Sequence, residues 1–234
     1  MTVHGGLDRG GSFARLARRL DDHCVISYDR RGYQGSRSNT PPSLSAHRDD
    51  LLAIVHELAH ISPVTVVGHS YGGVVALAAA AHNDSDLSGG IVTYEPPLPW
   101  ILRREGAAHG PLAAPREEAE SFFRRMVSDA AWERLSEVEK ESRRADGIAL
   151  VDDLATLRTP TSPIDLTQVQ VPVTYSYGDL DGRAEYYREV GAVLGTLCAE
   201  VNVVPMLNAG HGAHLSNPES FARIILEHER SLCV

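Results

Sequence analysis

Cysteine is scarce in this sequence, and long hydrophobic runs are absent. Three cysteines, Cys24, Cys198 and Cys233, are scattered over 234 residues. They are too few and too far apart for a disulfide framework or a cysteine zinc site, so we expect free thiols in a reducing compartment. No apolar run approaches the ~20 residues of a membrane span, and the N-terminus lacks the charged-then-apolar pattern of a signal peptide. The sequence therefore predicts a cytoplasmic protein without a membrane span.

Positive charge is also scarce. The chain has 22 lysines and arginines against 31 aspartates and glutamates, which gives a net charge of −9. This balance argues against nucleic acid or an anionic membrane as the main partner. The remaining composition, with 43% hydrophobic residues, is ordinary for a globular protein. The length suits one domain with a sizeable core and room for an insertion.

Short β-type runs alternate with helical stretches along most of the chain. We expect strands at 24–28, 64–67, 91–94, 171–177 and 200–206, and helices at 45–60, 74–82, 184–194 and 218–232. Alternation of this kind predicts an α/β fold, a mostly parallel sheet with helices on both faces.

Residues 97–163 break this alternation. They contain no clear strand, their composition is charged and helical, and Ser136 with Glu139 fits a capping box. We interpret the segment as a helical cap, or lid, over a core formed by residues 1–96 and 164–234. Its expected apolar underside consists of Phe122, Phe123, Met126, Trp132 and Leu135.

The run Gly68-His69-Ser70-Tyr71-Gly72 is the most informative stretch of the chain. An apolar β-type segment leads into it, and an alanine-rich helical segment leads out. A serine at the tip of such a strand–turn–helix has a strained backbone and holds its hydroxyl above the sheet edge, an arrangement called a nucleophile elbow. Side chains two residues either way would clash there, so glycine is needed on both sides. We therefore predict Ser70 as the nucleophile.

A serine nucleophile needs a base within hydrogen-bond reach, and the best candidate is His211. It follows the last predicted strand, so it lies on a loop at the sheet edge where Ser70 also emerges. His214, three residues on, is the alternative base. The His-x-x-His spacing is also compatible with a metal site, but no third ligand is evident nearby, so we predict no metal.

The base in turn needs a carboxylate to fix its tautomer and stabilise the imidazolium. Asp179 and Asp181 both lie in the turn after the penultimate strand, on the same sheet edge. Aspartates in turns often serve turn geometry, and we favour Asp181 over Asp179. Glu95, directly after the strand at 91–94, is a third candidate; its other interpretation is a carboxylate that orders the Pro96-Pro97 turn, or a surface group.

An acyl transfer site also needs N–H donors aimed at the developing oxyanion. The backbone N–H of Tyr71, next to the serine, is one predicted donor. The second should come from an early strand–helix loop, and His4-Gly5-Gly6-Leu7 opens the chain. Because glycine lets the backbone come close to a ligand, we choose the Gly6 N–H, with that of Leu7 second.

These motifs together resemble the α/β-hydrolase superfamily, in particular its lidded, serine esterase-like members. They are spread over nearly the whole chain: His4-Gly5-Gly6, Asp29-Arg30-Arg31-Gly32, Gly68-His69-Ser70-Tyr71-Gly72-Gly73, Tyr94-Glu95-Pro96-Pro97, Gly178-Asp179-Leu180-Asp181 and Gly210-His211. The resemblance implies the order serine, acid, histidine, with the acid as the second aspartate and the base right after glycine. It also implies an eight-stranded pattern with a cap between the sixth and seventh strands.

Two departures from this pattern matter. Members usually have two or more strands before the His-Gly loop, yet here His4 is almost the first residue, so the opening strands are missing and the next is a stub. An uncovered sheet edge is an association hazard, and we hypothesise a homodimer through that edge or a destabilised fold. The second departure is Gln34, where members more often have glycine.

The expected chemistry follows from these assignments. His211 takes the Ser70 proton, Ser70 attacks a carbonyl, and the N–H groups of Tyr71 and Gly6 hold the oxyanion before water releases the acid. We predict a cofactor-independent serine hydrolase of a carboxylic ester or related acyl bond, such as a thioester or lactone, with a small-molecule acyl substrate. The alternatives are a carbon–carbon or amide hydrolase on the same triad, or a ligand-binding, degenerate hydrolase with negligible turnover.

Overall fold

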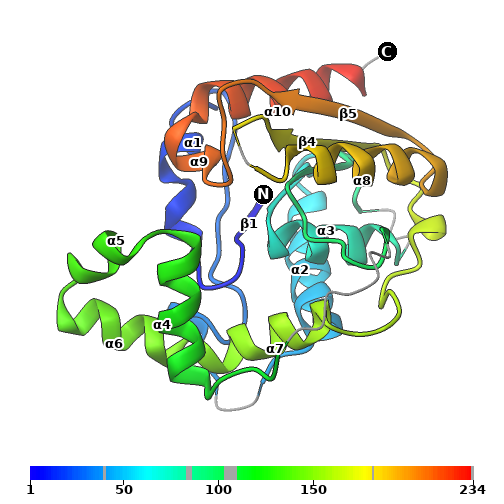
Figure 1. Cartoon of the computed structure of the whole chain (residues 1–234). Helices are drawn as coiled ribbons and strands as arrows, with labels where there is room; N and C mark the ends of the chain where they lie inside the picture. Colours follow the sequence, from blue (N-terminus) through cyan, green and yellow to red (C-terminus); the bar gives the residue numbers. More distant parts are fainter. Residues whose placement is uncertain (39–40, 83–85, 103–109, 181, 233–234) are drawn as a thin grey trace.

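The computed structural model describes residues 1–38, 41–82, 86–102, 110–180 and 182–232. Within these residues the centre of the molecule is a five-stranded parallel sheet in the order β1-β2-β3-β4-β5 (Figure 1). The strands are β1 (Thr2–Val3), β2 (Val66–His69), β3 (Ile91–Tyr94), β4 (Val173–Gly178) and β5 (Val201–Met206). Because all of them are parallel, their carboxyl ends meet at one edge of the sheet, where such folds place their chemistry.

Helices cover both faces of this sheet, as the alternation predicts. One face carries α1 (Ala14–Ala17), α9 (Ala213–Ser216) and α10 (Pro218–Ser231), and the other carries α2 (Leu44–Ala59), α3 (Tyr71–Ala80) and α8 (Ala184–Leu197). Successive strand residues feed the two cores in turn: Val66 packs with the second group and Val67 with the first, because side chains alternate along a strand. The described residues also contain three 3-10 turns: η1 (Gly10–Phe13), η2 (Gln34–Ser36) and η3 (Leu166–Gln168).

One predicted strand is wrong. Residues 24–28 form no strand, and their pairing with the sheet is a single parallel bridge between Ser27 and Thr2. The neighbour on that side, β1, is only two residues long, so it offers too short a ladder for the β-branched run to extend. The other four expected strands and all four expected helices are confirmed to within a few residues at their ends.

Within the segment predicted as a cap, residues 115–157 form four helices joined by short turns. They are α4 (Pro115–Met126), α5 (Asp129–Glu133), α6 (Glu137–Ala145) and α7 (Gly147–Leu157), drawn in green beside the core in Figure 1. The capping box of α6 is confirmed, because the Ser136 and Glu139 side chains each bind the other's backbone N–H. We refer below to α4–α7 as the helical cap.

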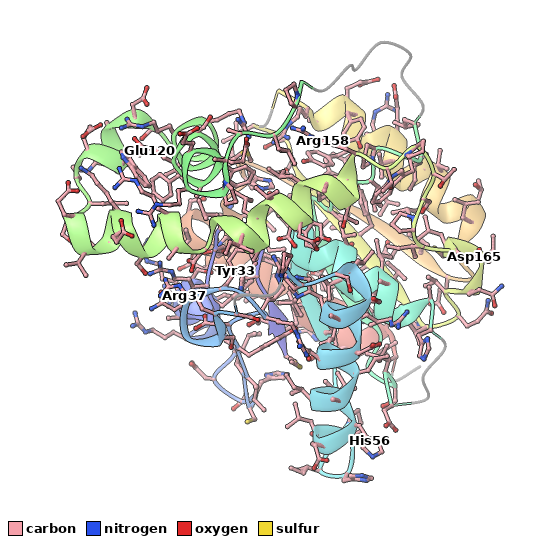
Figure 2. The ribbon with its side chains drawn as sticks, turned by 90° about the horizontal axis from the view of Figure 1, so that it is seen from below. Tyr33, Arg37, His56, Glu120, Arg158 and Asp165 are labelled. Atoms are coloured by element: carbon pink, nitrogen blue, oxygen red, sulfur yellow. The ribbon has the colours of Figure 1, made fainter. Side chains whose placement is uncertain are left out.

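Two buried carboxylates of the helical cap hold it against the core. Asp146, whose side chain is fully buried, pairs with Arg37 at 2.7 Å and with Arg9 at 3.5 Å. Asp153 of α7 pairs with Arg30 at 2.6 Å and accepts a hydrogen bond from Tyr33 at 2.5 Å. Figure 2 shows Tyr33 and Arg37 on the side of the core that faces the green helices.

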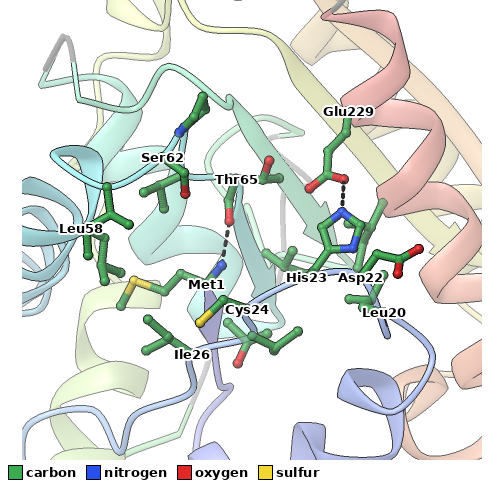
Figure 3. A pocket seen from close by; sticks show the side chains of 17 residues that line it. Met1, Leu20, Asp22, His23, Cys24, Ile26, Leu58, Ser62, Thr65 and Glu229 are labelled. Carbon is green, nitrogen blue, oxygen red and sulfur yellow. Dashed lines mark hydrogen bonds and ion pairs between the residues drawn. The ribbon is translucent and has the colours of Figure 1, made fainter.

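A cavity of about 320 Å³ lies at the amino ends of the strands, far from the edge that carries the predicted site (Figure 3). There the ammonium group of Met1 donates to the carbonyl of Thr65 at 2.7 Å, and His23 meets Glu229 at 2.8 Å. Burial lowers the pKa of the Met1 ammonium to about 6. Among the described helices, none combines the length and apolarity that crossing a bilayer requires.

Candidate active site

Ser70 occupies the sharp turn between β2 and α3. Its backbone has φ 52° and ψ −125°, a left-handed conformation that costs a residue with a side chain of order 1–3 kcal/mol. The turn is closed by two glycines: a Cβ on Gly68 would lie 2.5 Å from the carbonyl oxygen of Gly72, and a Cβ on Gly72 would overlap the carbonyl oxygen of Val3. The predicted nucleophile elbow is therefore present in shape, with Ser70 at its tip.

Glu95 and His211 meet at the same edge of the sheet. Nδ1 of His211 donates to Oε2 of Glu95 at 2.6 Å, and Oε1 of Glu95 accepts from the N–H of Gly178 at 2.9 Å. Glu95 is fully buried and follows β3 with a positive φ of 47°. The two hydrogen bonds fix the carboxylate, and the first leaves Nε2 of His211 as the ring nitrogen that can accept a proton.

The loop that carries His211 is held from below. The hydroxyl of Tyr94 donates to the carbonyl of Gly210 at 2.9 Å, and Nε2 of His69 donates to the carbonyl of His211 at 2.8 Å. Burial, followed by the nearby imidazoles of His214 and His211, lowers the pKa of His69 well below its usual range, so its ring stays neutral. These contacts connect His69, the residue before Ser70, directly to the loop that carries His211.

The other predicted acids and the alternative base lie elsewhere or outside the description. Oδ1 of Asp179 accepts from the N–H of Ala209 at 3.3 Å, so it orders the turn beneath the histidine loop. Asp181, like Cys233, lies outside the described residues. His214 is buried, and its Nε2 faces Asp8 at 3.5 Å. Of the two candidate carboxylates that the structure describes, Asp179 and Glu95, the one hydrogen-bonded to His211 is Glu95.

The loop with the second predicted oxyanion donor is clamped by Arg30, which is fully buried. Its Nε donates to the carbonyl of His4 at 2.9 Å, its Nη2 donates to the carbonyl of Gly5 at 3.3 Å, and its backbone N–H donates to Nε2 of His4 at 2.9 Å. Burial, followed by the charge of Arg30, lowers the pKa of His4 to about 4, so this histidine is a neutral structural group. Gly6 follows directly, and a Cβ there would lie 3.3 Å from Leu150 of the helical cap.

Asp153 neutralises Arg30 in the same buried network. Its two oxygens accept from Nη1 and Nη2 of Arg30 at 3.3 and 2.6 Å, and Nη1 also donates to His47 at 2.8 Å. Burial alone would raise the pKa of Asp153, but the charge of Arg30 and its hydrogen bonds lower it to about 2. One cap carboxylate thus balances the cation that holds the His4–Gly5 carbonyls.

A cavity of about 150 Å³ lies over Ser70, between the sheet edge and the helical cap. Its walls are mostly apolar. The lining residues are Gly6, Ser70, Tyr71, Pro97, Phe122, Met126, Leu150, Asp153, Leu154, Leu157, Arg183, Tyr187 and His211. Phe122 and Met126, two of the predicted underside residues, face this space, whereas Trp132 is buried against Phe123 within the cap at a ring separation of 5.4 Å.

Sequence reasoning missed the Arg30–Asp153 network. The Asp29-Arg30-Arg31-Gly32 run marked Arg30 as part of a motif, but nothing in the sequence linked it to a carboxylate 123 residues away. The position of Glu95 directly after a strand, with a diproline behind it, was a usable signal for a carboxylate at the sheet edge that carries Ser70 and His211.

A parallel sheet with a serine in a tight strand–helix turn and a histidine after the last strand is the architecture of an α/β hydrolase. The model of the Alpha/beta hydrolase family matches residues 2–224, and the chain belongs to this family. It is 25% identical over 239 residues to 2-succinyl-6-hydroxy-2,4-cyclohexadiene-1-carboxylate synthase from Enterobacter sp. (strain 638), covering 96% of this chain and 89% of that protein.

Solved structures agree on the fold. An esterase from Exiguobacterium antarcticum superimposes with a TM-score of 0.72 at 19% identity, covering 98% of this chain and 90% of the esterase. A bromoperoxidase from Bacillus anthracis superimposes with a TM-score of 0.73 at 18% identity, covering 98% and 91% of the two chains. Proteins named for three different activities thus share this architecture, so the activity has to be argued from the site itself.

Proposed function

We propose that the protein is a serine hydrolase of carboxylic esters or related acyl bonds, with a triad of Ser70, His211 and Glu95. The observation that carries the proposal is the 2.6 Å hydrogen bond from His211 to the buried Glu95, on the edge where the elbow presents Ser70. A buried carboxylate on Nδ1 sets the tautomer with a free Nε2 and stabilises the imidazolium formed during catalysis. Glu95 thereby replaces Asp181, our first choice from the sequence, as the proposed acid.

The proposed reaction has two halves, formation and hydrolysis of an acyl-enzyme, and His211 acts in both. Nε2 of His211 takes the proton of the Ser70 hydroxyl as its oxygen attacks the carbonyl, and then protonates the leaving group. Water, activated by the same nitrogen, attacks the acyl-enzyme and releases the acid. The backbone N–H groups of Tyr71 and Gly6, which both line the cavity, are the proposed oxyanion donors.

The cavity favours a short acyl group. Its volume of about 150 Å³ and its lining by Phe122, Met126, Leu150 and Leu154 suit a few apolar carbons next to the scissile carbonyl. An apolar pocket with a few convergent polar groups is the usual form of a small-molecule site. We therefore propose esters or thioesters of short, uncharged acids as the first substrates to test.

A carboxylate-bearing substrate is the second candidate. The Enterobacter relative is named for a carboxylate product. Arg183 is one of the residues that line the cavity, and its guanidinium carbon lies 5.5 Å from the ring centroid of Tyr187. A guanidinium group is well suited to hold a carboxylate. Matched p-nitrophenyl esters of butyric and succinic acid distinguish the two candidates. If the substrate carries a carboxylate, Arg183→Met should raise KM for the succinyl ester and leave KM for the butyryl ester unchanged.

The decisive experiment measures turnover of p-nitrophenyl butyrate and labelling by a fluorophosphonate. Wild type should react with both, and Ser70→Ala with neither. Glu95→Gln should lower kcat by about 10³–10⁴-fold, the cost of the wrong histidine tautomer, whereas Asp181→Asn and Asp179→Asn serve as matched acid controls and should retain most of the activity. Turnover that survives in Ser70→Ala ends the serine mechanism, and a folded wild type that takes no label points to a ligand-binding protein instead.

A further inference from the structure

Three side chains that the proposed mechanism does not use converge beneath the His211 loop. Asp8 follows the early glycine loop, His69 ends β2, and His214 lies in α9; one ligating atom of each lies within 4.8 Å of the other two. The rings of His69 and His214 have centroids 4.3 Å apart, and Nε2 of His214 lies 3.5 Å from Oδ2 of Asp8. Because the three come from distant segments, the sequence alone does not bring them together, and the cluster contains His214 of the predicted His-x-x-His pair but not His211.

Three imidazole nitrogens in this cluster are buried and make no well-formed hydrogen bond to any described residue. His69 is 5% exposed and His214 is 2% exposed. Since Nε2 of His69 donates to the carbonyl of His211, its Nδ1 carries a lone pair, and within the described part of the chain this atom has no hydrogen-bond partner. Among those residues, Nδ1 of His214 also has no hydrogen-bond partner, and its Nε2 faces Oδ2 of Asp8 at 3.5 Å, longer than a well-formed hydrogen bond. Buried polar atoms are rarely left unsatisfied, and an ion is one recognised explanation.

We propose that Asp8, His69 and His214 bind one divalent transition-metal ion of the zinc class, with water in the remaining position. Two imidazole nitrogens and one carboxylate oxygen are common zinc ligands. With metal–ligand distances of about 2.0–2.2 Å, tetrahedral ligands stand about 3.4 Å apart. The Asp8–His214 pair, at 3.5 Å, already has this spacing, and a pair at the outer limit of 4.8 Å would close by about 1.4 Å.

The surroundings meet two further requirements of a metal site. Ligands are normally oriented by hydrogen bonds from their other atoms. Nε2 of His69 satisfies this by donating to the His211 carbonyl at 2.8 Å. The Asp8 carboxylate is held in place by the hydroxyl of Ser12, which donates to Oδ2 at 2.9 Å. The Asp8 side chain is 23% exposed, which gives the ion a path from solvent.

An ion at this position would join the three loops of the proposed site. Asp8 lies two residues after Gly6, His69 directly precedes Ser70, and His214 lies three residues after His211. Binding to the folded chain alone stabilises it by mass action, so the ion should raise the melting temperature. The proposal does not depend on the hydrolase activity, because its readout is metal binding.

The test titrates ZnCl₂ into the chelator-treated full chain by calorimetry and follows thermal unfolding with and without zinc. His56 and His60, whose rings lie 4.9 Å apart near the end of α2, are a competing histidine pair, so His60→Ala is the matched control. Wild type and His60→Ala should each bind one tightly held ion per chain and melt at a higher temperature in zinc. Asp8→Asn and His214→Ala should each weaken binding by about 100-fold or more.

Two results overturn the proposal. One is zinc binding that is equally tight, or equally absent, in wild type and in both ligand variants. The other is binding that disappears in His60→Ala, which assigns the ion to α2. Circular dichroism before titration shows whether His214→Ala has folded; Asp8→Asn keeps the side-chain shape at a partly exposed position, so it decides the question if the histidine variant does not fold.

Discussion

Replacing Asp153 by asparagine should destabilise the protein strongly, because it leaves the Arg30 guanidinium buried without its counter-ion. The pair has Nη2 and Oδ2 2.6 Å apart, with side-chain exposures of 0% and 2%. Removing one partner of a buried ion pair costs about 3–5 kcal/mol, since the desolvated charge that remains is uncompensated. For a chain of this length, each kcal/mol shifts the melting temperature by about 2–4 °C, so we expect a fall of roughly 10 °C.

The pKa of Asp153 gives an independent magnitude. The charge of Arg30 and its hydrogen bonds overcome the effect of burial and lower this pKa from 3.8 to about 2, which corresponds to about 2 kcal/mol. Because the folded pKa is lowered, this contribution is complete above the unfolded pKa and is lost as the pH falls toward 2. The stability difference between wild type and Asp153→Asn should therefore be present at pH 7–8 and shrink as the pH falls below 4.

Urea unfolding followed by circular dichroism measures these differences. The matched control is Asp152→Asn, one residue earlier on α7, which changes the same group outside the ion pair. A difference below about 1 kcal/mol between wild type and Asp153→Asn at pH 7 would refute the reasoning.

Three further predictions follow from other parts of the structure. Burial, followed by the charge of Asp153, raises the pKa of Asp152 to about 6, so ionising this carboxyl group costs stability as the pH rises from 4 to 6. Asp152→Asn should therefore be more stable than wild type at pH 7 but not at pH 4. Urea titrations at the two pH values measure the difference. Gly72→Ala should fail to yield stable protein in a thermal shift assay, because its Cβ would overlap the Val3 carbonyl, whereas Gly11→Ala, with open space at its Cβ, should melt like wild type. Met126 forms part of the cavity wall over Ser70, so Met126→Ala should shift the preference among p-nitrophenyl esters towards longer acyl chains without loss of kcat on the best substrate. An unchanged chain-length profile would show that this wall does not contact the acyl group.

Much of the fold was predictable because its signals are local. The glycines around Ser70, the β-branched runs and the proline that starts α10 each act within a few residues, and the elbow and most elements lie where these signals indicate. The run at 24–28 shows the limit of such signals: its composition suits a strand, but strand formation depends on a partner, and β1 offers only two residues.

The choice of acid was not decided by local sequence. Asp179, Asp181 and Glu95 all follow strands at one sheet edge, and nothing in the sequence measures which carboxylate reaches the histidine. In the fold, Glu95 follows β3 with a positive φ and accepts a hydrogen bond from His211, the contact on which we propose it as the acid.

The amino-acid sequence by itself determined the chain's α/β architecture, its serine elbow and the histidine loop, since each depends on short-range sterics and hydrophobic patterning. Only the tertiary structure decided which distant groups share a buried space: Glu95 with His211, Arg30 with Asp153, and Asp8 with His69 and His214. The physical reason is that electrostatic and hydrogen-bond partners are selected by distances of a few ångströms, and those distances arise only when segments far apart in the chain pack together.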